Sequence, residues 1–193
     1  MKIWDSKEKI FTDQTGKFPH QSVDGKRYIM VMVENDSSYI DAEPMKDKTS
    51  QEMIKTYKEL LRRIKASGVC NPKLHILDNE ASKEYQVEIE KQCKMQMVPP
   101  DTHRRNIAER AIQTFKNHFV AILAGVDPHF PISLWSMLLP QAVLTLNLLR
   151  PSNIAPKVSV HAYMHGQFDY NAMPLAPMDC AVQLYLKPHR QKS

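Results

Sequence analysis

The order of apolar segments is the feature that most constrains the fold of this chain. Residues 27–34 (Arg-Tyr-Ile-Met-Val-Met-Val-Glu) are rich in apolar and β-branched side chains and predict a central strand. A shorter strand over residues 9–13 precedes it, and a hairpin turn at 35–38 leads to an antiparallel strand over 39–43. Strands and helices alternate after this point. The order predicts an α/β fold with a mixed five-stranded sheet flanked by helices.

Helix and strand signals in the remaining chain support this order. Thr49 or Ser50 can cap a helix that runs to about Ser67 and stops at Gly68, and its apolar positions recur at helical spacing. The elements expected after it are a strand at 73–77, a helix from Ser82 to about Cys93, a strand at 95–98, and helices at about 104–124 and 131–149.

The composition changes along the chain and predicts three parts. Residues 1–8 are expected to form an N-terminal extension and residues 9–150 a core. Residues 151–193 are expected to form a C-terminal extension, because prolines and turn residues multiply from Pro151 onward. Within that extension, residues 181–186 alternate like a short edge strand.

Charge and cysteine content narrow the functional class. A formal net charge of +5 and a pI near 9.0 favour a polyanionic partner only mildly. The three cysteines are odd in number and far apart, which indicates reduced thiols in an intracellular compartment. No apolar stretch is expected to approach the ~20 residues of a membrane span, and the N-terminus lacks the apolar region of a signal peptide. We therefore expect an intracellular protein with no membrane partner.

Three acidic residues stand where a metal site could form. Asp13 ends the first strand, Asp78 follows the strand at 73–77, and Glu109 opens the helix at 104–124. Divalent metals that serve phosphodiester chemistry need hard oxygen ligands held on rigid elements. Carboxylates at the carboxyl ends of strands lie where α/β sheets usually form ligand sites.

The helix that carries Glu109 has a polar face beside its apolar seam. With Glu109 at zero on a wheel of about 100° per residue, Lys116 falls near −20°, Arg105 near −40°, Gln113 near +40° and Asn106 near +60°. Such cationic and amide side chains can bind the phosphates of a nucleic acid while the glutamate binds a metal ion. The alternative is a solvated face with incidental ion pairs, which describes most polar helix faces.

Several segments carry a family resemblance. The segments are residues 12–16, 76–79 and 99–110, with further agreement at 26–43, 146–150, 159–166 and 174–177. Together they resemble the catalytic core of retroviral and retrotransposon integrases, in particular those of copia-type elements. The likeness spans roughly residues 9–187.

The resemblance implies a fold, an activity and a set of site residues. It implies a ribonuclease H-like fold and a DDE triad, Asp13, Asp78 and Glu109, that binds two Mg²⁺ or Mn²⁺ ions. The implied activity is that of a polynucleotidyl transferase, which processes element DNA ends and joins them to target DNA. The implied partners are double-stranded DNA and further copies of the chain. The implied location is the nucleus when the protein acts on host DNA.

The sequence also departs from the family pattern. Between the second and third carboxylates stand 109 − 78 − 1 = 30 residues, fewer than the family usually has. Glu80 and Ile107 occupy positions where the family commonly has glycine, and we expect both changes to stiffen the active-site loop. No metal ligand is lost.

Other functions remain open at this point. The chain could be a catalytically inactive remnant of a retrotransposon that binds DNA or oligomerises, or a ribonuclease H-like nuclease. His103 fits a structural role as well as a catalytic one. His161 and His165 have the i, i+4 spacing of half a zinc site, but no Cys-x-x-Cys pair accompanies them, so a histidine pair at a helix end is favoured. The basic helix at 51–65 is expected to be solvated rather than bound to DNA.

Overall fold

The computed structural model describes residues 7–77, 81–97, 107–177 and 180, and within them it contains one mixed sheet. The strands are β1 (Lys9–Gln14), β2 (Tyr28–Glu34), β3 (Ile40–Met45), β4 (Leu74–Leu77) and β5 (Lys94–Met97). Their order in the sheet is β3-β2-β1-β4-β5. The pairs β1–β2 and β2–β3 are antiparallel, whereas β1–β4 and β4–β5 are parallel. The predicted α/β class, with a five-stranded mixed sheet of the ribonuclease H-like type, is confirmed.

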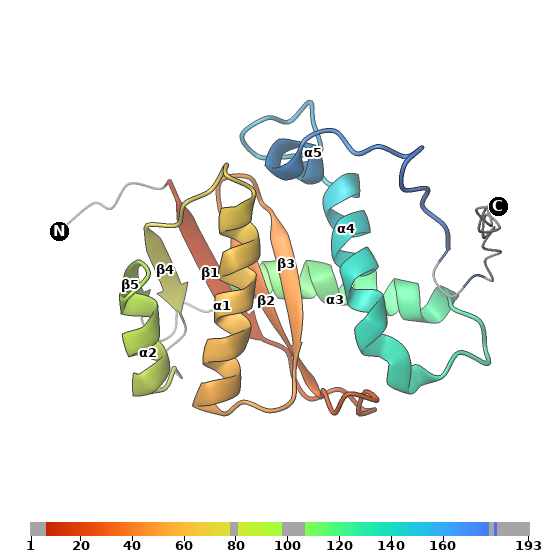
Figure 1. The fold of residues 1–193 in the computed structure, drawn as a ribbon, viewed down its shortest axis with the longest axis horizontal. Coiled ribbons are helices and arrows are strands. Elements are labelled where there is room, and N and C mark those ends of the chain that lie inside the picture. Colours follow the sequence, from red (N-terminus) through yellow and green to blue (C-terminus); the bar gives the residue numbers. More distant parts are fainter. Residues whose placement is uncertain (1–6, 78–80, 98–106, 178–179, 181–193) are drawn as a thin grey trace, which may run out of the picture.

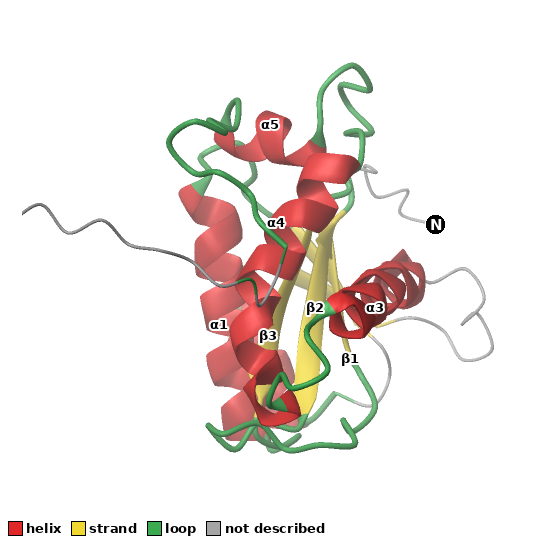
Figure 2. Ribbon diagram, turned by 90° about the vertical axis from the view of Figure 1, so that its right-hand side faces the viewer, coloured by secondary structure: helices red, strands yellow, loops and turns green. Residues whose placement is uncertain are grey.

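Helices cover both faces of this sheet (Figures 1 and 2). They are α1 (Ser50–Ala66), α2 (Lys83–Glu90), α3 (Ile107–Gly125), the 3₁₀ helix η2 (Ile132–Leu138), α4 (Leu139–Leu149) and α5 (Val160–His165). Buried side chains of α1, α2 and α5 form one core with the sheet, and those of α3, η2 and α4 form a second core on the other face. The helix α5 lies within the predicted C-terminal extension and contributes Val160 and Met164 to the first core.

Alternation along the inner strands explains the two cores. In β1, Ile10 belongs to the core beneath α1, and Phe11 belongs to the core beneath α3. In β2, Met30 and Met32 face the first core, while Ile29, Val31 and Val33 face the second. Successive side chains of a strand point to opposite faces, so a strand covered on both faces is apolar throughout. This agrees with the interior strand predicted for residues 27–34.

The caps of the first two helices lie where the sequence indicates. The Thr49 side chain accepts a hydrogen bond from the Glu52 amide, and the Ser82 side chain accepts one from the Tyr85 amide. Gly68, just past α1, has a φ of +71°, which glycine adopts without strain. The end expected for α2 at about Cys93 is wrong. The helix ends at Glu90, because Lys94 already pairs with β4 through its amide and the Lys73 carbonyl, 3.0 Å apart.

The single helix predicted over residues 131–149 is also wrong in part. Residues 132–138 form η2, and the α-helical turns begin at Leu139. Pro140 explains the change, because it has no amide hydrogen and fits an α-helix only in the first turn. The edge strand predicted at 181–186 lies outside the described residues.

One segment contradicts the expectation that no apolar stretch approaches membrane-span length. Ile132–Leu149 is long and apolar enough by length and composition, and 39% of it is buried in the fold. Its apolar character has a second explanation, because Trp135, Leu139, Ala142 and Leu146 fill the core beneath α3. A helix of a folded core passes the same test of length and composition.

Candidate active site

Asp13 lies next to the carboxyl end of β1, the middle strand of the sheet. Its carboxyl group is half-buried, and Oδ1 accepts a hydrogen bond from the Gln14 amide at 2.7 Å. Asp13 is two residues beyond Phe11, so the period-2 alternation places both side chains on the face that α3 covers. Asp13 is held by its pairing with Val31 of β2, and β1 also pairs with β4 up to Phe11.

The strand β4 runs parallel to β1 and ends at the same edge of the sheet. Phe11 of β1 is paired with Ile76 of β4, and β4 ends one residue later, at Leu77. The next residue, Asp78, lies outside the described residues, as do Arg105, Asn106 and His103. The carboxyl ends of parallel strands form the usual position of a ligand site in an α/β sheet.

The helix α3 supplies Glu109, Gln113 and Lys116. It is anchored through Ile112, Phe115 and Phe119, all of which are buried, as the predicted apolar seam requires. Glu109 is in the first turn and exposed to solvent. Gln113 and Lys116 are also exposed, and the Gln113 amide donates to Asn117 Oδ1 at 2.8 Å.

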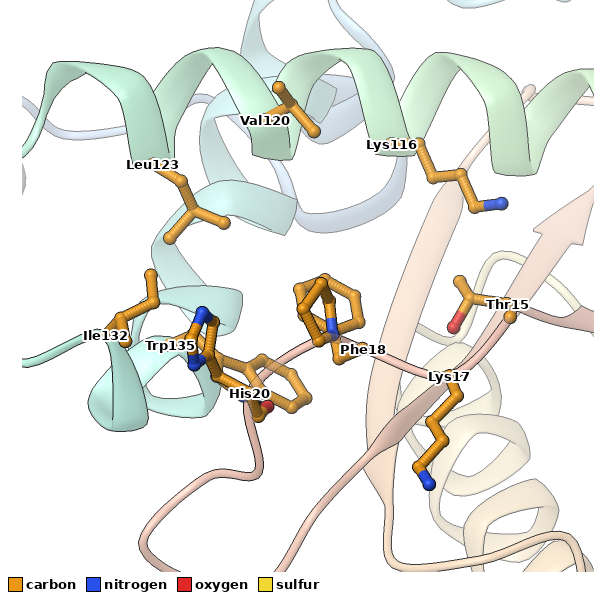
Figure 3. Close-up of a pocket in the computed structure, with 11 residues that line it drawn as sticks. Thr15, Lys17, Phe18, His20, Lys116, Val120, Leu123, Ile132 and Trp135 are labelled. Atoms are coloured by element: carbon orange, nitrogen blue, oxygen red, sulfur yellow. Dashed lines mark hydrogen bonds between the residues drawn. The ribbon is translucent and has the colours of Figure 1, made fainter.

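The polar face of α3 continues into a pocket. Val120 and Leu123 lie about +20° and −40° from Glu109 on the helical wheel, on the same face as Lys116. These three residues line a cavity of about 370 Å³ together with the segment that leaves β1 and with η2 (Figure 3). The face of α3 that carries Glu109 therefore faces residues 15–20, which follow Asp13, in the later turns of the helix.

The segment after β1 is fixed by backbone and aromatic contacts. The Thr15 amide donates to the Ile29 carbonyl at 2.8 Å, and Thr15 Oγ1 accepts from the Ile29 amide at 3.0 Å. Phe18 stacks on Trp135 with ring centroids 4.5 Å apart, and Trp135 Nε1 donates to the His20 carbonyl at 3.0 Å. Trp135 is fully buried in the core.

Sequence reasoning missed this pocket. The missed lining residues include Lys17, Phe18, His20, Val120 and Ile132. A signal was present, because Val120 is an apolar residue on the polar face of α3, about 20° from Glu109 and away from the apolar seam. The contact of that face with residues 15–20 depends on tertiary structure and has no local pattern.

A buried polar cluster lies on the opposite face of β1, behind Asp13. Thr12 Oγ1 is 2.8 Å from His75 Nε2 of β4 and 3.4 Å from the Tyr85 hydroxyl of α2. Tyr57 of α1 stacks on the His75 ring with centroids 5.2 Å apart. Complete burial lowers the pKa of His75 to about 3, so the ring is neutral. These contacts tie the two strands together at the level of the residue before Asp13.

The donor atoms suit a hard divalent cation. Carboxylate oxygens are the ligands that Mg²⁺ and Mn²⁺ prefer, and Asp13 presents its group from a rigid strand. Within the part of the chain that the structure describes, no three His, Cys, Asp or Glu side chains gather as a metal site. The predicted triad is represented in that part by Asp13 and Glu109 alone.

Two other sequence signals have structural explanations. His161 and His165 lie on α5 with ring centroids 5.2 Å apart, and His165 is the last residue of the helix. They form the histidine pair at a helix end that the sequence favoured. The basic helix α1 has ion pairs on its surface, such as Lys58 with Glu88 and Arg62 with Glu59.

Comparison with known proteins adds one finding about the fold. No family model and no curated protein matches the sequence. The fold is similar to that of a chain in the cryo-EM structure of the simian T-cell lymphotropic virus intasome in complex with PP2A regulatory subunit B56 gamma. The TM-score is 0.64 at 18% identity, over 93% of this chain and 60% of that chain. At this identity the likeness concerns the fold alone, and the chain spans about three fifths of its structural neighbour.

Proposed function

We propose that this chain is the catalytic domain of an integrase related to those of copia-type retrotransposons. In this proposal it is a metal-dependent polynucleotidyl transferase that processes element DNA ends and joins them to target DNA. The observation that carries the proposal is the position of Asp13, at the carboxyl end of the middle strand and on the face that α3 covers with Glu109 in its first turn. The fold shared with a chain of a viral intasome supports it.

Asp13, Asp78 and Glu109 are the proposed ligands of two Mg²⁺ or Mn²⁺ ions. When bound, such a pair activates a water or a DNA 3′-hydroxyl and stabilises the leaving oxygen of an in-line displacement. Asp13 contributes a carboxylate whose position is set by β1 pairing and by the Gln14 amide. Glu109 contributes a carboxylate from the start of α3, whose packing through Phe115 and Phe119 fixes the helix against the sheet.

The polar face of α3 is the proposed DNA contact. Lys116 and Gln113 are exposed on it, and Arg105 and Asn106 precede it in the sequence. Lysine and arginine neutralise phosphates, and amide side chains add hydrogen bonds that set the register of the duplex. The proposed partners are element ends and target DNA, with at least two copies of the chain acting together in the nucleus.

A strand-transfer assay on short duplexes tests the proposal. We expect wild-type protein with Mg²⁺ or Mn²⁺ to give joined products, and Asp13→Asn, Asp78→Asn or Glu109→Gln to give none. Each of these variants should keep its melting temperature within a few degrees, because a carboxylate is replaced by an amide of the same size. Glu90→Gln, which changes an exposed residue of α2, is the matched control and should join DNA normally.

The same assay separates the competing functions. A wild-type chain that binds duplex DNA but yields no joined or trimmed product with either metal behaves as an inactive remnant. Cleavage of RNA–DNA hybrids without joining of DNA identifies a ribonuclease H-like nuclease. A carboxylate variant with full joining activity would eliminate the assigned triad.

A further inference from the structure

A second pocket lies where the turn between β2 and β3, the start of α3 and the end of α4 meet. It has a volume of about 300 Å³, which is at the lower end of the range for small-molecule sites. Asn35 of the turn lines it, and the Asn35 amide donates to the carbonyl of Lys9, the first residue of β1, at 2.9 Å. None of its lining residues belongs to the pocket beside Asp13.

The charged residues of this second pocket are two arginines. Arg110 of α3 and Arg150, which follows α4, line it, and no acidic residue of the described chain does so. Neither arginine takes part in an ion pair within the described residues. By contrast, Arg63 of α1 pairs with Asp41 and Glu43. The pocket therefore carries two positive charges that no carboxylate of the fold balances directly.

Arg150 is fixed in position without a counter-charge. Its side chain is half-buried, and Nη1 donates to the Ser38 carbonyl at 2.8 Å. Burial lowers the pKa of the guanidinium. A guanidinium has five N–H donors, and a backbone carbonyl is a weak substitute for the water that burial removes. A bound anion would offset this desolvation cost.

The acidic side chains of the turn have partners elsewhere. The Glu34 carboxylate accepts hydrogen bonds from the Ser37 amide at 2.7 Å and from the Ser37 hydroxyl. Asp36 Oδ2 accepts from the Glu8 amide at 2.8 Å. Neither acid lines the pocket. These bonds keep both carboxylates within the turn and the chain before β1, so they do not fill the anion position.

Short polar side chains surround the two guanidinium groups. The Thr114 hydroxyl donates to the Arg110 carbonyl at 2.9 Å, and the Asn153 amide donates to the Ser37 carbonyl at 3.4 Å. Amide and hydroxyl groups can donate to an oxyanion beside the arginines. The neutral polar residues of the lining are Asn35, Ser38, Thr114 and Asn153, and its apolar residues are Val33, Ile40, Ile107 and Ala111.

The donors and the size of the pocket select the ligand. Two arginines match a phosphate group better than a carboxylate, because a phosphate offers more acceptor oxygens and more negative charge. The volume of about 300 Å³ requires a compact ligand. A DNA duplex is broad and rigid, and a half-buried guanidinium such as that of Arg150 is reached more easily by a small molecule.

We propose that this pocket binds a compact phosphorylated small molecule, whose phosphate oxygens pair with Arg110 and Arg150. The proposal does not depend on the proposed integrase function, and its residues are separate from the proposed metal ligands and DNA contacts. Because the ligand would join the β2–β3 turn, α3 and the end of α4, it should stabilise the native chain on binding.

Isothermal titration calorimetry of the full chain with inorganic pyrophosphate tests this proposal. EDTA in the buffer keeps divalent metals away, and sodium chloride holds the ionic strength constant. We expect one site with a Kd on the order of 10–100 μM. Pyrophosphate at about 100 times the Kd should raise the melting temperature by several degrees, and acetate at the same ionic strength should not.

Four variants locate the site. We expect Arg110→Gln and Arg150→Gln each to weaken pyrophosphate binding on the order of tenfold or more. Arg110 is exposed and in no ion pair within the described chain, so Arg110→Gln keeps the fold even if loss of the Ser38 contact destabilises Arg150→Gln. Lys116→Gln at the other pocket and Arg62→Gln on α1 remove the same charge and should bind pyrophosphate as wild type does.

The contrary results are distinct. Absence of pyrophosphate binding by the folded wild-type chain, or wild-type affinity in Arg110→Gln, would overturn the proposal. Weaker binding by Lys116→Gln would place the anion in the other pocket and would also overturn it. If pyrophosphate displaced a fluorescent duplex and Arg110→Gln weakened duplex binding equally, the pocket would be part of a DNA surface and not a small-molecule site. The strand-transfer assay reports on the proposed function separately from all of these results.

Discussion

His75 shows how a single residue links the candidate site to stability. The ring is fully buried between β1 and α1, and its Nδ1 has no hydrogen-bond partner within the described residues. Burial lowers the pKa to about 3 from an ordinary value of 6.5. Placing a charged imidazolium there would cost desolvation energy with no acidic partner to offset it. The native state therefore requires the neutral ring.

A pH dependence follows from this shift. Between pH 6.5 and about 3 the unfolded chain binds a proton at His75 and the native chain does not, so stability falls as the pH falls through this range. The slope contributed by His75 approaches ~1.4 kcal/mol per pH unit. We expect His75→Gln to lose this slope. Urea unfolding of both proteins at several pH values between 7 and 4 measures it, and parallel curves would contradict the assignment.

Asp41 of β3 carries the opposite dependence. It is 1% exposed, and burial raises its pKa to about 6, although Arg63 Nη1 lies 3.4 Å from Oδ1 and lowers it in part. Desolvation outweighs the ion pair, since Oδ2 has no partner within the described residues. The native chain binds the extra proton between about pH 4 and 6, so this group makes stability rise as the pH falls.

The two groups can be separated by mutation. In the wild-type chain the contributions of His75 and Asp41 offset each other between about pH 4 and 6. We expect Asp41→Asn to lose stability more steeply than wild type on acidification over this range, because only the histidine slope remains. The same urea titrations measure this, and a variant less sensitive to acid than wild type would refute the sign assigned to the Asp41 contribution.

Among the elements, α4 packs against the edge strand β3, and the Asn147 side chain of α4 adds hydrogen bonds to the β3 backbone. Asn147 Nδ2 donates to the Ile40 carbonyl at 2.7 Å and to the Val143 carbonyl at 2.9 Å, and Asn147 Oδ1 accepts from the Ile40 amide at 3.1 Å. Asn147 is 1% exposed. Its side chain therefore provides hydrogen-bond partners for both the amide and the carbonyl of Ile40, and β3 has no further strand on that side of the sheet.

Removal of this amide should destabilise the fold. We expect Asn147→Ala to lower the free energy of unfolding by about 2–4 kcal/mol, because it leaves buried backbone groups of β3 without partners. Leu149→Ala in the same helix is the control, since Leu149 is 76% exposed and should change stability by less than about 0.5 kcal/mol. Equal losses in the two variants, measured in urea, would show that the amide bonds contribute little.

The elements that the sequence predicts well are those whose signals are local. The apolar run in residues 27–34, the Thr49 cap and the apolar seam of Ile112, Phe115 and Phe119 depend on neighbours in the chain, and all three lie as expected. The split at Pro140 has a local cause that a count of apolar residues overlooks. The periodicity of apolar residues therefore predicts the strands of the sheet, but it does not separate η2 from α4.

The candidate site was predictable only in part for the same reason. Asp13 and Glu109 could be identified because the first lies near the end of a predicted strand and the second near the start of a predicted helix. Both element ends are visible in the local sequence pattern. Lys116 and Lys17 line one pocket although they are 99 positions apart in the sequence (116 − 17). Their proximity to this pocket follows from the way α3 crosses the sheet. Contacts of that kind arise from packing and leave no periodic signal in either segment.

At the scale of the whole molecule, the two helical faces differ in how their cations are used. On the α1 and α2 side, Lys58 and Lys91 both pair with Glu88. On the α3 side, Lys17 and Lys116 take part in no ion pair within the described part of the chain and lie at one pocket. In a chain of net charge +5, the lysines near the proposed DNA contact are thus less neutralised by carboxylates than those near α1 and α2.

This asymmetry predicts which lysine governs DNA binding. Each phosphate that a lysine neutralises adds about 0.9 to the slope of log affinity against log salt. We expect Lys116→Gln to weaken duplex binding and to lower that slope by about one. Lys91→Gln removes the same charge from the α2 side and should leave both quantities nearly unchanged. Anisotropy titrations over a range of salt concentrations measure the two slopes. Equal losses in the two variants would mean that overall charge, and not the α3 face, attracts the DNA.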